Sequence, residues 1–112
     1  MSRPNLTRRL ILEAPVQLPD GAGGYTESWS ALGTLWAEIN PRFGRFASAV
    51  GGTVSVTAAL ITVRAAPVGH SNRPVPGQRF RNGSRVFTIE AVSEADARAM
   101  FLECQCKEEI AA

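Results

Sequence analysis

The sequence contains no acidic residue from position 39 to position 89, although the same stretch carries seven arginines. Residues 1–38 have a formal charge of −1, from three arginines against four acids. Residues 90–112 have a formal charge of −4, from two cations against six acids, so the net charge of +2 hides a segregation. A cationic stretch of this kind favours a partner rich in phosphates or carboxylates. The acidic C-terminal part of a second copy is one such partner if copies pack head to tail.

Residues that usually carry catalysis are scarce. The only histidine, His70, lies in a proline-rich stretch and has no serine, aspartate or cysteine partner at a useful spacing. The glycine-rich residues 21–24 are not followed by the lysine and serine of a phosphate-binding loop. Cys104 and Cys106 fall on one face of an expected strand, a spacing that does not suit a disulfide, and no histidine is near enough to complete a zinc site. We expect two reduced, buried thiols, no cofactor, no metal site and no enzymatic activity.

The sequence also lacks a long apolar run. No segment approaches the length of a membrane span. Residues 1–5 lack the apolar core of a signal peptide. The length of 112 residues suits one domain, covering residues 1–112. We therefore expect a cytoplasmic protein without a membrane partner.

Short apolar segments separated by turns make up the first part of the chain. Residues 8–14 predict an edge strand that ends at Pro15. The glycines of residues 21–24 predict the tip of a hairpin, and residues 25–29 predict its returning strand. Residues 30–33 then predict a bulge or a bend.

The second part of the chain has the same character. Asn82-Gly83 is the strongest hairpin signal in the sequence and predicts a type I′ turn. Further strands are expected at 34–40, 54–65, 78–81 and 85–92, the last of these with a bulge. A loop is expected at 67–77 and a wide turn at 93–99. The last expected strand, 100–107, is followed by a frayed tail at 108–112, and its inward face holds Met100, Leu102, Cys104 and Cys106.

These elements predict an all-β, mainly antiparallel fold, a small β-barrel of about six to seven strands. A long projecting loop, residues 40–53, joins the second and third strands. Pro41 lacks an N–H group, so the second strand is expected to stop there. Residues 45–50 can form one or two helical turns before the glycines that follow. Because the loop is basic, aromatic and rich in glycine, it is the candidate for function; on the alternative interpretation it is a solvated crossover whose phenylalanines cover the edge of the core.

Several short motifs occur in a characteristic order along nearly the whole chain. They are the N-terminal RRLILEAP strand, a tryptophan followed by WAEINP, a Gly-Arg pair, the strand VSVTAALITVRAAP and a hairpin of the form G-x-R-x-F-x-I. In this order they resemble the phage head–tail adaptor or head-closure family, and the alanine- and arginine-rich composition is also similar to that of phage-like gene transfer particles. The sequence departs from the family pattern at Gly51-Gly52-Thr53 and in the long loop at 67–76. The residues that fit the pattern are Trp29, Trp36, Ala37, Ile39, Pro41, Gly44, Arg45, Gly83, Arg85, Phe87 and Ile89.

The resemblance implies a virion component without enzymatic activity. Copies would form a sixfold or twelvefold ring, with portal and adaptor proteins above it and tail terminator or tail tube proteins below it. The protein would be in the host cytoplasm during assembly and then in the neck of the particle. Loop 40–53 would project into the channel and line or close it. Arg42 and Arg45 of this loop would contact the phosphates of double-stranded DNA without sequence preference. Phe43 and Phe46, beside Gly44, would form a constriction. Pro41, Gly51 and Gly52 would act as hinges.

Two alternatives stay open at this stage. The arginines can instead pair with acids of a neighbouring subunit, or the chain can be a stand-alone small-barrel nucleic-acid-binding protein that uses residues 39–89 as its footprint. Such a protein would bind DNA as a monomer with a steep salt dependence. The residues expected to carry charge between subunits are Arg79, Arg81, Arg85, Glu94, Asp96 and Glu103.

Overall fold

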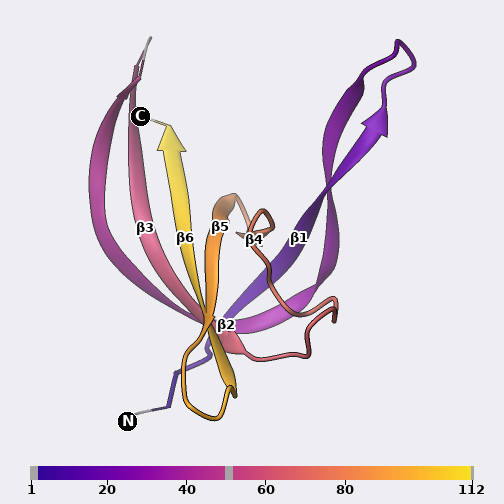
Figure 1. Ribbon diagram of the computed structural model, residues 1–112. Coiled ribbons are helices and arrows are strands. Elements are labelled where there is room, and N and C mark those ends of the chain that lie inside the picture. Colours follow the sequence, from indigo (N-terminus) through magenta and orange to yellow (C-terminus); the bar gives the residue numbers. More distant parts are fainter. Residues whose placement is uncertain (1–2, 50–51, 112) are drawn as a thin grey trace.

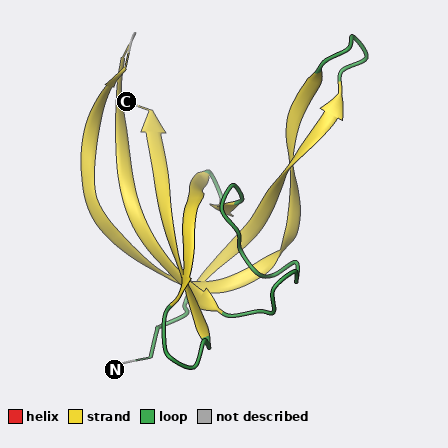
Figure 2. Cartoon of the chain, viewed as in Figure 1, coloured by secondary structure: helices red, strands yellow, loops and turns green. Residues whose placement is uncertain are grey.

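The computed structural model describes the backbone of residues 3–49 and 52–111 and the side chains of residues 3–42 and 57–108. Within these residues the structure is all-β, and its six strands follow one another antiparallel in a closed barrel of order β1-β2-β3-β6-β5-β4 (Figures 1 and 2). The predicted fold class is therefore confirmed. The strands are β1 (Arg8–Pro19), β2 (Tyr25–Ala49), β3 (Gly52–Arg64), β4 (Arg79–Asn82), β5 (Arg85–Glu94) and β6 (Phe101–Ala111).

The barrel closes where the short strand β4 pairs with β1. Leu12 lies opposite Phe80 in this seam, and Phe80 lies opposite Phe87 of β5. All three side chains point inward and are at most 1% exposed. The rest of the core comes from inward positions of the other strands, namely Leu10, Leu35, Ala37, Ala59, Ile61, Val63, Ile89, Leu102, Cys104 and Cys106.

Two long hairpins extend from the same end of the barrel and diverge (Figure 1). One is formed by β1 and the first half of β2, with its tip at residues 20–24. The other is formed by the second half of β2 and by β3, and β6 runs beside β3 as far as the pair Val54 and Ala111. β2 takes part in both because it is 25 residues long. The N-terminus and the β5–β6 turn lie at the opposite end (Figure 1).

The structure corrects two predicted strand ends. β1 continues through Pro15 to Pro19, and β2 continues through Pro41 to Ala49, so the described part of the 40–53 segment is a β-hairpin and contains neither an open loop nor a helical turn. Beyond Pro41 the register shifts, and Arg42 and Phe43 together oppose the single residue Ala58. A proline is tolerated beside such a bulge because the local ladder is already interrupted.

Three predictions on turns and bulges have different outcomes. The bulge expected at residues 30–33 is confirmed, because Gly33 pairs with Leu12 and Ala31 with Glu13. The bulge in β5 is confirmed at Glu90, where the register shifts between Ile89 and Ala91. The type I′ turn at Asn82-Gly83 is wrong. Asn82 pairs with Arg85, so Gly83 and Ser84 are the central residues, and only Gly83 has a positive φ, of 62°, as in a type II′ turn.

The predictions for the last strand are partly wrong. Leu102, Cys104 and Cys106 are buried as expected, but Met100 precedes β6 and is 45% exposed. The tail is not frayed over its described residues, because β6 extends to Ala111 and Glu108 is only 4% exposed. The wide turn expected at 93–99 is confirmed in outline, with β5 ending at Glu94 and residues 95–100 outside any strand.

Candidate DNA-facing hairpin

The hairpin of β2 and β3 from Pro41 to Ala59 carries the segment predicted to face DNA. Gly44 lies in β2 opposite Thr57, and Gly52 lies in β3 opposite Ala49. Both glycines therefore belong to the strand ladder. In the described part of this hairpin the ladder is interrupted at the bulge of Arg42 and Phe43 opposite Ala58. The hinge role of Pro41, Gly51 and Gly52 stays a prediction.

Arg42 is the charged residue of this hairpin among the side chains that the structure describes. It is exposed and borders a hollow of about 310 Å³ together with Glu90, Glu103 and Lys107. The hollow lies where β2, β3, β5 and β6 meet below the bulge. The side chains of Phe43, Arg45 and Phe46, and all of Gly51, lie outside the described residues.

Two of the arginines expected at subunit contacts pair within the chain. The Nε atoms of Arg79 and Arg81 donate to the two carboxylate oxygens of Glu13 at 2.8 and 2.9 Å. Arg79 also stacks on Trp29, with its guanidinium carbon 3.9 Å from the ring centre. Burial alone would raise the pKa of Glu13, but hydrogen bonds from Arg81 and Arg79 and their charges outweigh it and hold that pKa below its ordinary value. The cluster ties the root of the β1–β2 hairpin to the barrel seam.

The third arginine, Arg85, forms a bidentate ion pair with Glu108. Its Nε and Nη2 atoms donate to the carboxylate at 2.8 and 2.9 Å. Glu108 lies opposite the buried Phe87, on the inward face of β6, and the Arg85 guanidinium lies 4.9 Å from the Phe87 ring centre. The pair closes the core at the end of the barrel from which the hairpins extend. The hydrogen bonds that Arg85 donates to Glu108, together with the negative charge of Glu108, raise the pKa of Arg85.

The acids expected at subunit contacts lie at the other end and side of the barrel. Asp96 accepts hydrogen bonds from the backbone of Met100 and Phe101, so it stabilises the β5–β6 turn. Glu103 lies opposite Thr62 and Ser93, and Glu94 opposite Leu102. Among the described side chains none of these three acids forms an ion pair. Their pairing with a neighbouring subunit stays a prediction.

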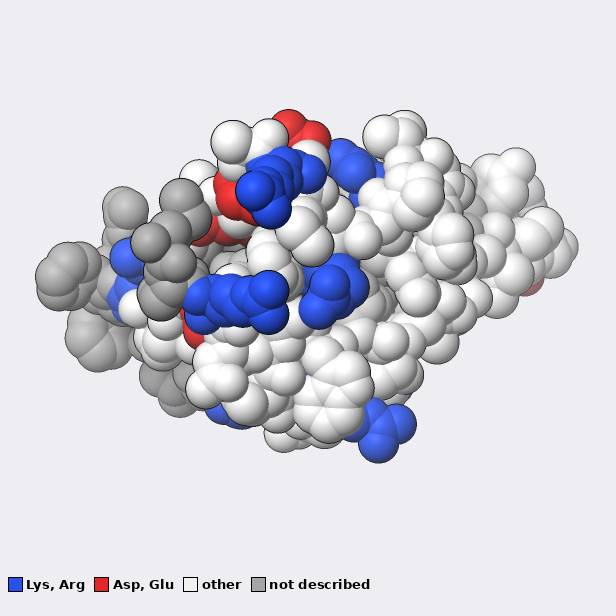
Figure 3. Space-filling view, turned by 90° about the horizontal axis from the view of Figure 1, so that it is seen from below, with Lys and Arg blue, Asp and Glu red and all other residues white. Residues whose placement is uncertain are grey.

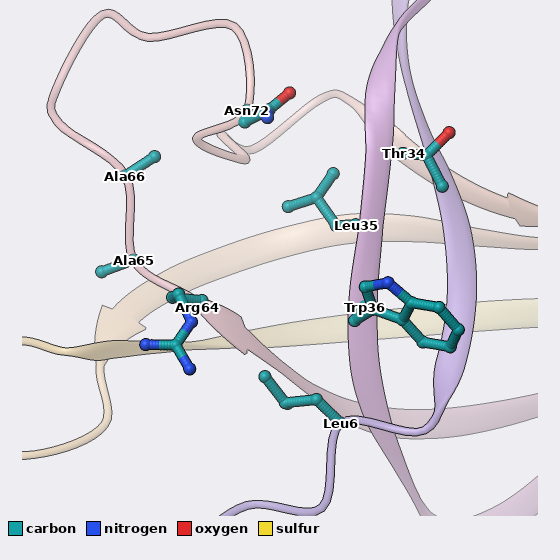
Figure 4. A pocket seen from close by; sticks show the side chains of 8 residues that line it. All are labelled: Leu6, Thr34, Leu35, Trp36, Arg64, Ala65, Ala66 and Asn72. Atoms are coloured by element: carbon teal, nitrogen blue, oxygen red, sulfur yellow. The ribbon is translucent and has the colours of Figure 1, made fainter.

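Sequence reasoning missed a surface hollow on the outside of the barrel. It measures about 250 Å³ and lies between β2, the end of β3 and the loop after β3 (Figure 4). Trp36, 55% exposed, forms one wall, and Leu6 and Arg64 lie across from it (Figure 4). The sequence signal was present, since Trp36 falls on the outward parity of a strand whose other face is buried.

Both cysteines are free and buried, as predicted. Burial raises the pKa of the Cys104 thiol to about 12, and burial with the nearby Cys104 and Glu90 raises the pKa of Cys106 as well. Because the thiolate is the reactive form, we expect neither thiol to react with a disulfide reagent at pH 8 in the folded protein, and both to react once it is denatured. Rapid labelling of the native protein would contradict the burial of β6.

No helix long and apolar enough to cross a membrane occurs in the part of the chain that the structure describes. In the same part no three histidine, cysteine, aspartate or glutamate side chains gather in a way that would hold a metal ion.

Comparison with known proteins assigns the chain to a family. Residues 1–109 match the phage head completion proteins. The chain belongs to this family. Membership covers nearly the full length, confirms the predicted resemblance and gives the chain a structural role in phage head completion rather than an enzymatic one.

A solved structure agrees with the assignment of this head completion protein. A chain from the structure described as the virion of a native gene transfer agent particle superimposes with a TM-score of 0.89 and is 44% identical. The match covers 98% of the present chain and 100% of the other. No curated protein matches the sequence significantly.

Proposed function

We propose that this head completion protein forms a ring between the portal–adaptor complex and the tail of a phage-like particle, and that its β2–β3 hairpin lines the DNA channel. The observation that carries the proposal is an exposed Arg42 on a bulge of a hairpin that extends beyond a closed barrel (Figure 1). The similarity to a chain of a gene transfer agent virion supports the particle context. The proposal includes assembly from copies made in the host cytoplasm.

Charge and stiffness of the hairpin support this role. No acid occurs from residue 39 to residue 89, so neither hairpin strand carries a carboxylate that would repel phosphates. Arginines in this position contact the DNA backbone without reading its sequence. A ring multiplies the contact, because every copy presents the same hairpin. Since β6 adds a third strand beside β3, the hairpin is stiff and bends at the Arg42–Phe43 bulge rather than at its glycines.

Reversing the charge of the hairpin is expected to impair DNA retention. In particles carrying Arg42→Glu with Arg45→Glu, we expect the chain to be incorporated normally and the DNA-filled fraction of particles to fall several-fold. The measurement is nuclease-protected DNA per particle after purification at low and high salt.

A matched control changes the same charge elsewhere. Arg8 and Arg98 are exposed, and they lie at the start of β1 and in the β5–β6 turn. Arg8→Glu with Arg98→Glu should leave DNA retention unchanged. Equal retention by both double variants would contradict the DNA-facing role of the hairpin. A chain that stays out of particles and binds short DNA as a monomer would contradict the ring itself.

A further inference from the structure

The hairpin of β1 and β2 ends in a two-stranded ribbon that no other strand covers. Residues 16–19 pair with residues 25–28, whereas β4 reaches β1 only at residues 11–13 and β3 reaches β2 only from Ala37. The ribbon projects from the barrel on the side away from the β2–β3 hairpin (Figure 1). A free two-stranded ribbon is marginally stable in water, so its persistence needs a cause.

The ribbon is held rigid at both ends. At its tip, Asp20 accepts backbone hydrogen bonds from Ala22 and Gly24 at 2.8 and 3.0 Å. These bonds lower the pKa of Asp20, so the carboxylate stays charged. At its root, Trp29 packs under Arg79, which Glu13 fixes in turn. A segment ordered in advance in this way loses little entropy on binding.

The chemistry of the ribbon is acidic and apolar. Leu18 is 48% and Tyr25 is 68% exposed. Asp20 and Glu27 supply two negative charges, and no lysine or arginine occurs from residue 10 to residue 41. Pro15 and Pro19 interrupt the donors of the β1 edge, so contacts through side chains are favoured over addition of a strand.

A surface of the opposite kind lies on the barrel of the same chain. The hollow beside Trp36 adjoins a second hollow of about 260 Å³, and the two share Leu6 and Arg64. We name this surface the Trp36 groove. Its lining includes two arginines and no carboxylate, and the residues used below are Arg3, Leu6, Thr34, Trp36 and Arg64. Viewed from below, cations recur over the middle of the barrel, whereas the ribbon at the right-hand end shows none (Figure 3).

We infer that the β1–β2 ribbon of one copy docks in the Trp36 groove of the next copy. Tyr25 and Glu27 share one face of the ribbon, whereas Leu18 lies on the other. With the first face in the groove, Tyr25 meets the apolar wall of Trp36 and Glu27 faces Arg64 and Arg3. A second copy is the occupant because the chain carries both complementary surfaces at separate places. A contact between two different patches repeats from copy to copy. It closes into a ring when the rotation between neighbouring copies is a whole fraction of a full turn. The inference rests on the proposed ring and identifies the contact that builds it.

Engineered cysteines test this contact in assembled particles. Gln17→Cys lies on the exposed ribbon face that carries Glu27, and Thr34→Cys lies in the groove. The buried native thiols do not compete. Particles carrying both substitutions are treated with a short bismaleimide and separated under denaturing conditions. We expect a ladder of multiples of this chain. The control pairs Gln17→Cys with Val68→Cys and should give no ladder, because Val68 is 85% exposed and lies outside the groove.

A charge exchange adds a readout that does not depend on the cross-linker. Glu27→Arg alone and Arg64→Glu alone should each lower the yield of the ladder several-fold, and the two together should restore it.

The remaining outcomes separate the two proposals. Cross-links from Gln17→Cys only to a different particle protein, or none between copies in particles that contain the chain, would overturn the docking and leave the head-completion role intact. Absence of the wild-type chain from particles would overturn the ring and the docking together.

Discussion

Replacing Phe80 with alanine is expected to lower the free energy of unfolding by about 3–5 kcal/mol. Phe80 is fully buried and contributes one of the two largest side chains of the core. Its partner across the strands is Phe87, which is also buried. Removal of the ring leaves a cavity that this small barrel cannot fill, because the walls of a closed sheet are held by hydrogen bonds on both sides.

The position of Phe80 makes the expected loss large. β4 has four residues and pairs with β1 over three of them, so few hydrogen bonds hold the seam of the barrel. Phe80 lies in the middle of that seam, opposite Leu12. The alanine variant should therefore lose hydrogen-exchange protection first in β4 and the facing part of β1, while the β3–β6 pair keeps its protection.

Chemical denaturation with circular dichroism measures the loss, and hydrogen exchange locates it. Tyr25→Ala is the matched aromatic control, because Tyr25 is 68% exposed and its loss should change stability by at most about 0.5 kcal/mol. A loss below about 1 kcal/mol for Phe80→Ala would mean that β4 does not close the barrel with Phe80 opposite Leu12.

The strands were predictable because their local patterns agree with their environment. In β6, Leu102, Cys104 and Cys106 alternate with polar residues, and the alternation alone identifies the buried face. The bulge near Gly33 was also predictable from a local break in the alternation. Such features need no knowledge of the partner strand.

Features that depend on the partner strand were missed or misassigned. Pro41 suggested the end of a strand, but a missing N–H group matters only where the ladder requires a donor, and the adjacent bulge interrupts the ladder. The pairing of Arg79 and Arg81 with Glu13 was missed because Glu13 lies 66 and 68 residues away in the sequence. Glu13 is the one acid of β1 and directly follows three apolar residues. This position was the sequence signal that its carboxylate needs a cationic partner.

The same dependence on pairing explains why the candidate surfaces were incomplete. The β1–β2 ribbon is a separate surface because β4 pairs with β1 only at residues 11–13, which no local sequence pattern predicts. The Trp36 groove needs the N-terminal segment, β2, β3 and the loop after β3 at one place. For the β2–β3 hairpin the sequence predicted the charge of the segment but not its conformation. Residues 45–50 have some helical propensity, but they form a strand because β3, which itself pairs with β6, also pairs with them.

Replacing Glu13 with glutamine is expected to lower the free energy of unfolding by about 1.5–3 kcal/mol at pH 7. The Glu13 side chain is only 7% exposed, and it receives one hydrogen bond from each of two arginines. Glutamine keeps the size of the side chain but leaves two guanidinium groups without an anion. The loss stays below that of a fully buried ion pair because Arg79 and Arg81 are 23% and 36% exposed and water screens them.

A surface pair provides the control for this substitution. Lys107 and Glu90 lie 3.3 Å apart, and both side chains are about half exposed. Glu90→Gln should therefore change stability by about 0–1 kcal/mol. A similar loss in both variants would show that Glu13 contributes no more than an ordinary surface carboxylate.

The pH dependence distinguishes the charge of Glu13 from its packing. Because its pKa in the folded state is below the ordinary value of 4.5, the unfolded chain binds more protons than the folded chain between these two pKa values. The stabilisation by Glu13 is therefore complete above the ordinary pKa and is lost as the pH falls through the folded pKa. The difference in unfolding free energy between the wild type and Glu13→Gln should be constant from pH 8 to about pH 5.5 and should shrink below about pH 4.5. A difference that does not change with pH would assign the effect of Glu13 to packing and hydrogen-bond geometry alone.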